Sequence, residues 1–199
     1  HILFPLVLLV AGLFVRIEEP RWFQQWQMWV FDSLNVLHPR VYDPGIGVRI
    51  VDIDDDTLEK VGQWPWPRTK IAELIYRLKQ AGAAVVAFDI VFSESDRTSP
   101  KNIVELWPQV PEFKDIRDRV REMPDHDEQL AQFIKQLGGV VTGFALTNAG
   151  APRIPTQRGN FAFSGPDARP FVQTYVGAVA NLSVLSEAAD GNGNFNMLP

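Results

Sequence analysis

Cysteine is absent from this chain of 199 residues, and histidine occurs only three times. The absence of cysteine excludes disulfide bonds, thiolate metal sites and a cysteine nucleophile, although it does not identify the cellular compartment. Lysine and arginine number 19 against 24 aspartates and glutamates, which gives a net charge of −5. Because the chain also has no run of basic residues, we expect no nucleic-acid partner.

The longest apolar run stands at the beginning of the chain. No residue from Ile2 to Val15 is charged, and Arg16 ends the run. A helix that spans a bilayer needs about 20 residues, so we interpret residues 1–16 as part of a transmembrane helix. A signal peptide fits less well, because the run has neither a basic segment before it nor a small-x-small cleavage site after it. A buried core helix is the remaining alternative.

Residues 17–40 carry apolar side chains at helical spacing. Trp22, Trp26, Trp29 and Leu37 fall on one stripe, which predicts an amphipathic linker helix rich in tryptophan. Tryptophan next to an apolar run is typical of the headgroup level of a membrane. Packing of the helix against the domain that follows explains the pattern equally well, and both interpretations can hold along its length.

Alternating strand and helix patterns fill residues 41–199, which we treat as one domain. Buried strands are predicted at 48–53 and 83–92, with an amphipathic helix at 69–82 between them. This order predicts a parallel sheet with a right-handed crossover. After a polar insertion, further elements are predicted at 125–139, 140–147, 174–180 and 181–190. The expected fold class is α/β, with a mainly parallel sheet flanked by helices and preceded by a membrane-proximal N-terminal helix.

Carboxylates follow both of the first two predicted strands, at the edge where open α/β sheets bind ligands. The first strand leads into Asp52 and Asp54, and the second leads into Asp89, Glu94 and Asp96. Since hard cations take oxygen ligands from several carboxylates, we predict a ligand site here. Asp52, Asp54 and Asp89 are its candidate ligands for a divalent cation, Ca²⁺ or Mg²⁺. The alternative assigns Glu94 and Asp96 to a solvated loop. It explains Asp52 and Asp89 less well, because both lie inside apolar runs, where we expect a functional or a hydrogen-bonded structural role.

The sequence Trp-Pro-Trp-Pro-Arg stands between the first predicted strand and the helix. Pro65 and Pro67 fix φ and restrict the preceding Trp64 and Trp66 to extended geometry. We expect a stiff segment whose tryptophans point to opposite sides. We also expect Arg68 to pair with Asp52, Asp54 or Asp89. We therefore add both tryptophans and the arginine to the predicted ligand site. A scaffold role for the segment is favoured over direct contact with the ligand.

A hydrolytic function also has to be considered. The stretch Ile-Val-Asp-Ile-Asp-Asp-Asp-Thr is similar to the first motif of haloacid-dehalogenase-type phosphohydrolases, an apolar strand followed by Asp-x-Asp-x-Thr/Val. Alignment on Asp52 brings Asp56 to the Thr/Val position, and alignment on Asp54 brings Leu58 there. No lysine and distal acidic pair complete the set in the sequence. A metal-dependent phosphohydrolase is therefore kept only as an alternative.

Residues 48–96 resemble the type-2 CHASE domain, the cyclase- and histidine-kinase-associated extracellular sensor. The family's hallmarks are Ile-Asp-x-x-Ser/Thr-Leu, Gly-x-Trp-Pro-Trp-Pro-Arg and Gly-Ala-x-x-Val-x-Phe-Asp-x-x-Phe. They stand here at residues 53–58, 62–68 and 82–92. A less distinctive similarity in the order of elements extends over residues 30–199.

The resemblance implies a non-catalytic sensor domain on the periplasmic or extracellular side of the cell membrane, held there by the N-terminal helix. It implies an output domain in the same polypeptide, most commonly an adenylate or guanylate cyclase and otherwise a histidine or Ser/Thr kinase. We expect a homodimer, a small ligand of unknown identity, and a sensor domain that continues beyond residue 199. A ligand-free module in which the tryptophan helix assembles the receptor is the structural alternative.

Overall fold

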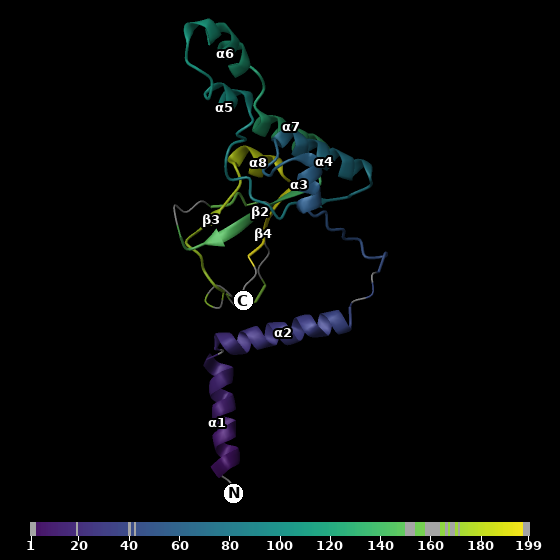
Figure 1. Ribbon diagram of the computed structural model, residues 1–199, viewed down its shortest axis with the longest axis vertical. Coiled ribbons are helices and arrows are strands. Elements are labelled where there is room, and N and C mark those ends of the chain that lie inside the picture. Colours follow the sequence, from purple (N-terminus) through teal and green to yellow (C-terminus); the bar gives the residue numbers. More distant parts are fainter. Residues whose placement is uncertain are drawn as a thin grey trace. The chain divides into compact units, whose positions relative to one another are not determined.

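The computed structural model describes residues 3–18, 20–39, 41, 43–149, 154–157, 164, 165, 167, 170 and 172–196. The chain divides into two compact units, His1–Ile53 and Asp54–Pro199, which we call the N-terminal and the C-terminal unit and describe one at a time (Figure 1). The division comes later in the chain than the boundary predicted after residue 40.

The N-terminal unit consists of two helices and a segment without helix or strand. Helix α1 is Leu3–Glu18, and helix α2 is Arg21–Leu37, which begins directly after Pro20. Proline before a helix is favourable because its fixed φ suits the start of the first turn. The helices expected within residues 1–16 and 17–40 are therefore confirmed as helices. Among the described residues, no helix combines the length and the apolar character that crossing a membrane requires.

The strand predicted at residues 48–53 is wrong. No helix or strand occurs from Asp43 to Asp54, and the Ile50 side chain is 91% exposed. An isolated strand is unstable because its backbone groups need partners from a neighbouring strand. Within the described part of the chain, no strand pairs with this segment. An apolar pattern alone could not reveal that absence of pairing.

The C-terminal unit is built on a four-stranded sheet around β2. Strands β1 and β4 pair with β2 in parallel, and β3 pairs with it antiparallel. The predicted α/β class with a mainly parallel sheet is confirmed, although the strand expected at 83–92 is reduced to two residues. The strands are β1 (Val86–Ala87), β2 (Val140–Thr147), β3 (Gly177–Val179) and β4 (Gly191–Asn194).

Three helices cover this sheet, and each stands directly before one of the parallel strands in the sequence. Helices α4 (Arg68–Gln80), α7 (His126–Leu137) and α8 (Ser183–Ala188) precede β1, β2 and β4. Helix α7 packs against both α4 and α8, so the three form one layer (Figure 1). Ile71 and Ile75 on α4 are fully buried, and their spacing of four residues gives the helix one apolar face.

The remaining helices lie outside this layer. Helix α3 is Asp55–Val61, just before the Trp-Pro-Trp-Pro-Arg segment. The polar insertion between β1 and α7 contains α5 (Pro100–Val104), the 3₁₀ turn η1 (Pro111–Phe113) and α6 (Lys114–Arg121). Helices α5 and α6 pack on each other and project beyond the beginning of α7 (Figure 1). The loop directly after β1, which includes Asp96, therefore lies next to the beginnings of α4 and α7.

Candidate functional site

A pocket of about 220 Å³ lies where the Trp-Pro-Trp-Pro-Arg segment meets the chain that follows β1. Its walls combine aromatic and aliphatic side chains with ionic groups, a composition typical of small-molecule sites. The structure thus brings together five of the predicted ligand-binding residues from two separate parts of the sequence. These are Trp64, Trp66, Arg68, Glu94 and Asp96.

The Arg68 side chain is the buried cation of this site, with 8% of its surface exposed. Its Nε donates to Oδ1 of Asp127 at 2.9 Å, and its Nη2 donates to the carbonyl oxygen of Glu94 at 2.8 Å. The guanidinium carbon lies 4.6 Å from the centre of the Phe92 ring, a cation–π distance. Three different kinds of group therefore compensate the loss of hydration that burial imposes on the arginine.

The expectation that Arg68 pairs with Asp52, Asp54 or Asp89 is wrong, because its carboxylate partner is Asp127 at the beginning of α7. Helices α4 and α7 pack side by side, and the Arg68–Asp127 pair shows that their N-termini lie close together. Residues near those N-termini can therefore reach each other, although they are far apart in the sequence.

Asp96 joins the loop after β1 to the beginning of α4. Its Oδ2 accepts a hydrogen bond from the backbone N–H of Arg68 at 2.8 Å, and its Oδ1 accepts from the backbone N–H and the hydroxyl of Thr98. Burial raises the pKa of Asp96, but these hydrogen bonds outweigh it and hold the pKa below its ordinary value of 3.8. The carboxylate therefore stays ionised and caps a helix N-terminus from outside the helix.

Asp127 is a residue of this site that sequence reasoning missed, as it also missed Arg97 in the pocket wall. Besides binding Arg68, its Oδ2 accepts a hydrogen bond from the backbone N–H of Asp96 at 2.8 Å. The N-terminal cap of α7 is Asp125, whose Oδ1 accepts from the backbone N–H groups of Asp127 and Glu128. Asp127 follows two positions after this cap, and it is 4% exposed. The available signal in the sequence was an aspartate in the first turn of a helix that already has another aspartate as its cap.

His126 lies beside the same carboxylate network. Its Nδ1 is 3.2 Å from Oδ2 of Asp96, and its backbone N–H donates to the hydroxyl of Ser99 at 3.0 Å. These contacts fasten the first turn of α7 to the loop after β1. A residue far along the chain also holds the loop, because the backbone N–H of Phe92 donates to Oδ1 of Asn181 at 2.7 Å.

The two tryptophans do not point to opposite sides of the segment, so that expectation is wrong. Their ring centres are 5.6 Å apart in an edge-to-face arrangement, which is favourable for aromatic pairs. Trp66 is buried, and its indole N–H donates to the carbonyl oxygen of Gly62 at 2.7 Å. Trp64 is half-buried at the pocket, and the peptide bond between Trp64 and Pro65 is cis. The pair forms the aromatic wall of the pocket.

The other predicted site residues lie outside the pocket. The Oδ1 atom of Asp54 accepts hydrogen bonds from the hydroxyl and the backbone N–H of Thr57, which lower the pKa of Asp54. Asp89 is exposed in the C-terminal unit, and Asp52 is exposed in the N-terminal unit. Among the described residues, no group of three or more acidic or histidine side chains could hold a metal ion. Cation binding by Asp52, Asp54 and Asp89 stays a prediction.

The phosphohydrolase alternative loses its structural basis. Its motif requires a strand that delivers two aspartates at its end, whereas Asp52 and Asp54 follow a segment without strand. The carboxylate of Asp54 is moreover engaged as the N-terminal cap of α3. The geometry of this region is that of a capped helix rather than of a nucleophile and its acid/base partner.

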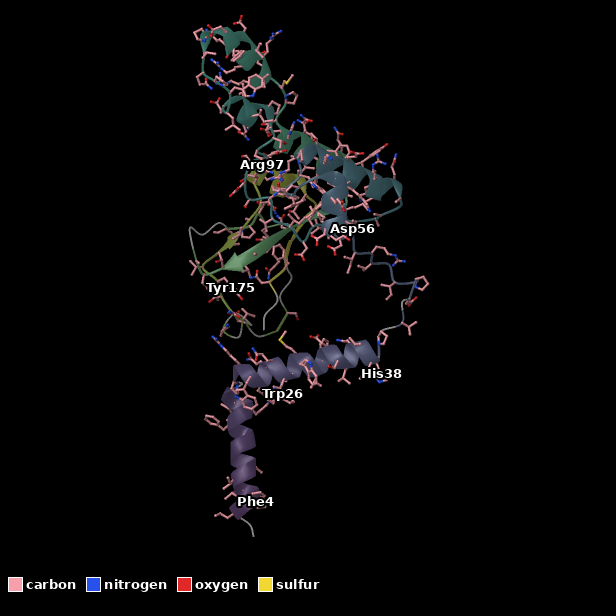
Figure 2. The ribbon with its side chains drawn as sticks, in the orientation of Figure 1. Phe4, Trp26, His38, Asp56, Arg97 and Tyr175 are labelled. Carbon is pink, nitrogen blue, oxygen red and sulfur yellow. The ribbon has the colours of Figure 1, made fainter. Side chains whose placement is uncertain are left out.

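Two ionic side chains of opposite sign stand at the rim of the pocket. Glu94 and Arg97 both line it and are exposed, and Arg97 is labelled in Figure 2. Within the described part of the chain, neither side chain forms an ion pair or hydrogen bond. Deeper in the pocket, the charge of Arg68 is balanced by Asp127. The arrangement can hold a small molecule between an aromatic wall and two ionic groups.

Comparison with known proteins gives one finding on the family and two without a match. The family model of the CHASE2 domain matches residues 6–199. Neither the curated proteins nor the solved structures include a match to the chain. The family match covers helix α1 from residue 6 onward, all of helix α2 and the whole of the C-terminal unit.

Proposed function

Because this chain belongs to the CHASE2 domain family, an extracellular sensor domain of signalling receptors, we propose that it receives its stimulus in the pocket at the Trp-Pro-Trp-Pro-Arg segment. The observation that supports this proposal most directly is the composition of the pocket. Its aromatic wall and its buried arginine belong to the Gly-x-Trp-Pro-Trp-Pro-Arg hallmark at residues 62–68. The segment is thereby a candidate for ligand contact as well as a structural corner.

The signal passes to an output domain of the same polypeptide, a nucleotide cyclase in the first instance and a histidine or Ser/Thr kinase otherwise. Such regulation requires two states of the sensor that differ in affinity for the stimulus. A homodimer provides a simple route, because a change in the arrangement of two sensor domains alters the arrangement of two output domains.

Helix α1 belongs, in this proposal, to a membrane anchor that keeps the sensor on the periplasmic or extracellular side. Its described apolar side chains are exposed all along the helix, from Leu3 at 76% to Ile17 at 71%. Exposed apolar surface of this extent is unfavourable in water and favourable in lipid. Arg16 then stands at the end of the apolar run, where a charged side chain suits the membrane surface.

The ligand class follows from the rim and the size of the pocket. A volume of about 220 Å³ admits a molecule smaller than most drug-sized ligands. Arg97 offers donors to a carboxylate, and Glu94 offers acceptors to an ammonium group, so a small zwitterion with an apolar part fits best. The packed rings of Trp64 and Trp66 would contact that apolar part.

A ligand screen by thermal unfolding tests this proposal. A ligand at a free concentration of one hundred times its Kd adds about 2.7 kcal/mol to the free energy of unfolding. Such an increase raises Tm measurably. We expect small zwitterions to raise Tm, and we expect Arg97→Ala or Glu94→Ala to abolish the effect. Arg119→Ala is the matched control, since Arg119 is also exposed but lies on α6. A ligand whose effect survives the two pocket variants binds elsewhere and contradicts the pocket assignment.

Binding of a divalent cation is a separate proposal. If Asp52, Asp54 and Asp89 bind Ca²⁺ or Mg²⁺, the ion raises Tm and the Asp89→Asn variant loses this increase. Absence of an increase with either ion removes the proposal without affecting the pocket, because none of these residues lines it.

A further inference from the structure

One face of helix α2 has no role in the sensor pocket and carries three exposed tryptophans. None of the residues of α2 is buried. Trp22 is 57% exposed, Trp26 65% and Trp29 66%. The Trp26 side chain extends away from the helix axis in Figure 2. Tryptophans left in water at this density are unfavourable, so the face needs an occupant.

The side chains of α2 separate into an apolar and a polar half. At about 100° per residue, the three tryptophans fall within one arc together with Val30 and Leu37. The opposite half is polar, with Met28 and Phe31 as its apolar members. Its polar side chains are the neutral Gln24, Gln25, Gln27 and Asn35 and the charged Arg21 and Asp32.

The composition of the apolar half favours lipid over a second protein surface. Paired helices bury a narrow seam of aliphatic side chains flanked by charges, whereas this half is wide and dominated by tryptophan. Arg21 and Asp32 are the only charged residues from the beginning to the end of α2. Indole rings with one polar N–H suit the boundary between headgroups and acyl chains.

The connection to α1 supports the same occupant. Two residues separate Glu18, the last residue of α1, from Arg21, the first of α2, and the second of them is Pro20. If α1 is embedded in a bilayer as in the proposed function, α2 begins at the bilayer surface. A rigid proline there ends one helical direction and permits another.

We propose that α2 is an interfacial helix that lies along the outer surface of the membrane with its tryptophan half in the lipid. The inference rests on the membrane anchoring in the proposed function and adds a second, lateral contact with the membrane. The helix would then hold the segment that leads to the C-terminal unit at a fixed depth. Attraction is apolar, so it does not require anionic lipid.

Spin labels on single cysteines test the inference in the full-length receptor, reconstituted in phosphatidylcholine nanodiscs. The absence of cysteine from residues 1–199 makes the labelling unambiguous once any cysteine outside this region is replaced by serine. Ser33→Cys places the label in the tryptophan half, and Asn35→Cys places the matched control on the opposite side of the same helix. Power saturation then compares accessibility to oxygen, which enters lipid, and to a water-soluble nickel chelate.

We expect the ratio of oxygen accessibility to nickel accessibility to be higher for the label at position 33 than for the label at position 35. This should hold with or without anionic lipid in the nanodisc. A label at Ser33 that is as accessible to nickel as the one at Asn35 overturns the inference. Dipolar broadening between two labels at Ser33 shows a second copy as the occupant, and a label inaccessible to both reagents shows a protein surface. Either of these results also overturns it.

A third label separates this inference from the proposed function. Leu9→Cys lies within α1 and is exposed on that helix. If Leu9 reports lipid while Ser33 reports water, the membrane anchor stands and the interfacial helix is wrong. If Leu9 reports water as well, membrane anchoring by α1 fails together with the inference.

Discussion

Burial of the Arg68 guanidinium is unfavourable unless its charge and donors find partners, and Asp127 supplies the balancing charge. The same carboxylate binds the backbone of Asp96, and Asp96 binds the backbone of Arg68. These three residues therefore close a ring that joins α4, α7 and the loop after β1. The pocket has fixed walls because this ring holds the loop.

The first prediction concerns the buried ion pair. Asp127→Asn leaves the Arg68 charge buried without a carboxylate, which should lower the free energy of unfolding by about 3–5 kcal/mol. Urea denaturation measures the change. The control is Asp118→Asn, because Asp118 pairs with Arg121 at 3.2 Å in an exposed position, where a pair contributes only about 0–1 kcal/mol. Equal effects of the two substitutions would show that the buried pair is not the stronger one.

The second prediction concerns pH. The pKa of Asp96 is lower in the folded protein than its ordinary value of 3.8, so the folded state binds fewer protons than the unfolded state as acid is added. Its contribution to stability is complete above the unfolded pKa and is lost as the pH falls below 3.8 toward the folded pKa. The difference in unfolding free energy between the native chain and Asp96→Asn should shrink over that window. A difference that is constant with pH would contradict the role of this carboxylate.

At the residue level, the sequence indicated some of the side chains that line the pocket, not Arg97 among them, and it did not indicate how they pair. Trp64, Trp66 and Arg68 belong to one motif, so their proximity needed no knowledge of the fold. The pairing of Arg68 with Asp127 spans 59 positions and depends on α4 and α7 packing side by side. Hydrophobic patterns predict that each helix is covered on one face, but they do not predict which polar residues meet at the ends.

Among the elements, the helices and the central strand were the most predictable. Strand β2 has the bounds Val140–Thr147 that its apolar run predicted, because a buried strand must be apolar on both faces. Helix α7 lies within the element predicted at 125–139 and begins directly after its cap, Asp125. The segment 48–53 shows the same kind of apolar run but no strand. Pairing of strands is a long-range property, and a short apolar run does not determine it.

The third prediction tests this difference by hydrogen exchange. Backbone amides of β2 should exchange slowly, since β2 has parallel partners on β1 and β4. Amides of Val48, Ile50 and Val51 should exchange quickly, because these residues are exposed and the described residues include no strand paired with them. Protection of these three amides comparable to that of β2 would show that the segment is a strand after all.

For the whole molecule, the two units divide the proposed function between them. The N-terminal unit presents apolar helices, and the C-terminal unit presents a sheet, a helical layer and the pocket. Family membership places such a chain in extracellular sensing. The proposal therefore connects a pocket outside the cytoplasm with an output domain on the other side of a membrane.

Labelling of a single cysteine on intact spheroplasts tests the central claim most directly. Leu106→Cys is suited to it, because Leu106 is 83% exposed and lies in the insertion between α5 and α6, away from the pocket. The variant is made in a protein in which any cysteine outside residues 1–199 is replaced by serine. A membrane-impermeant maleimide should label it before lysis, while the parent protein without Leu106→Cys and the fully buried Ile71→Cys variant stay unlabelled. Labelling of Leu106→Cys only after lysis would place the domain in the cytoplasm and contradict the account.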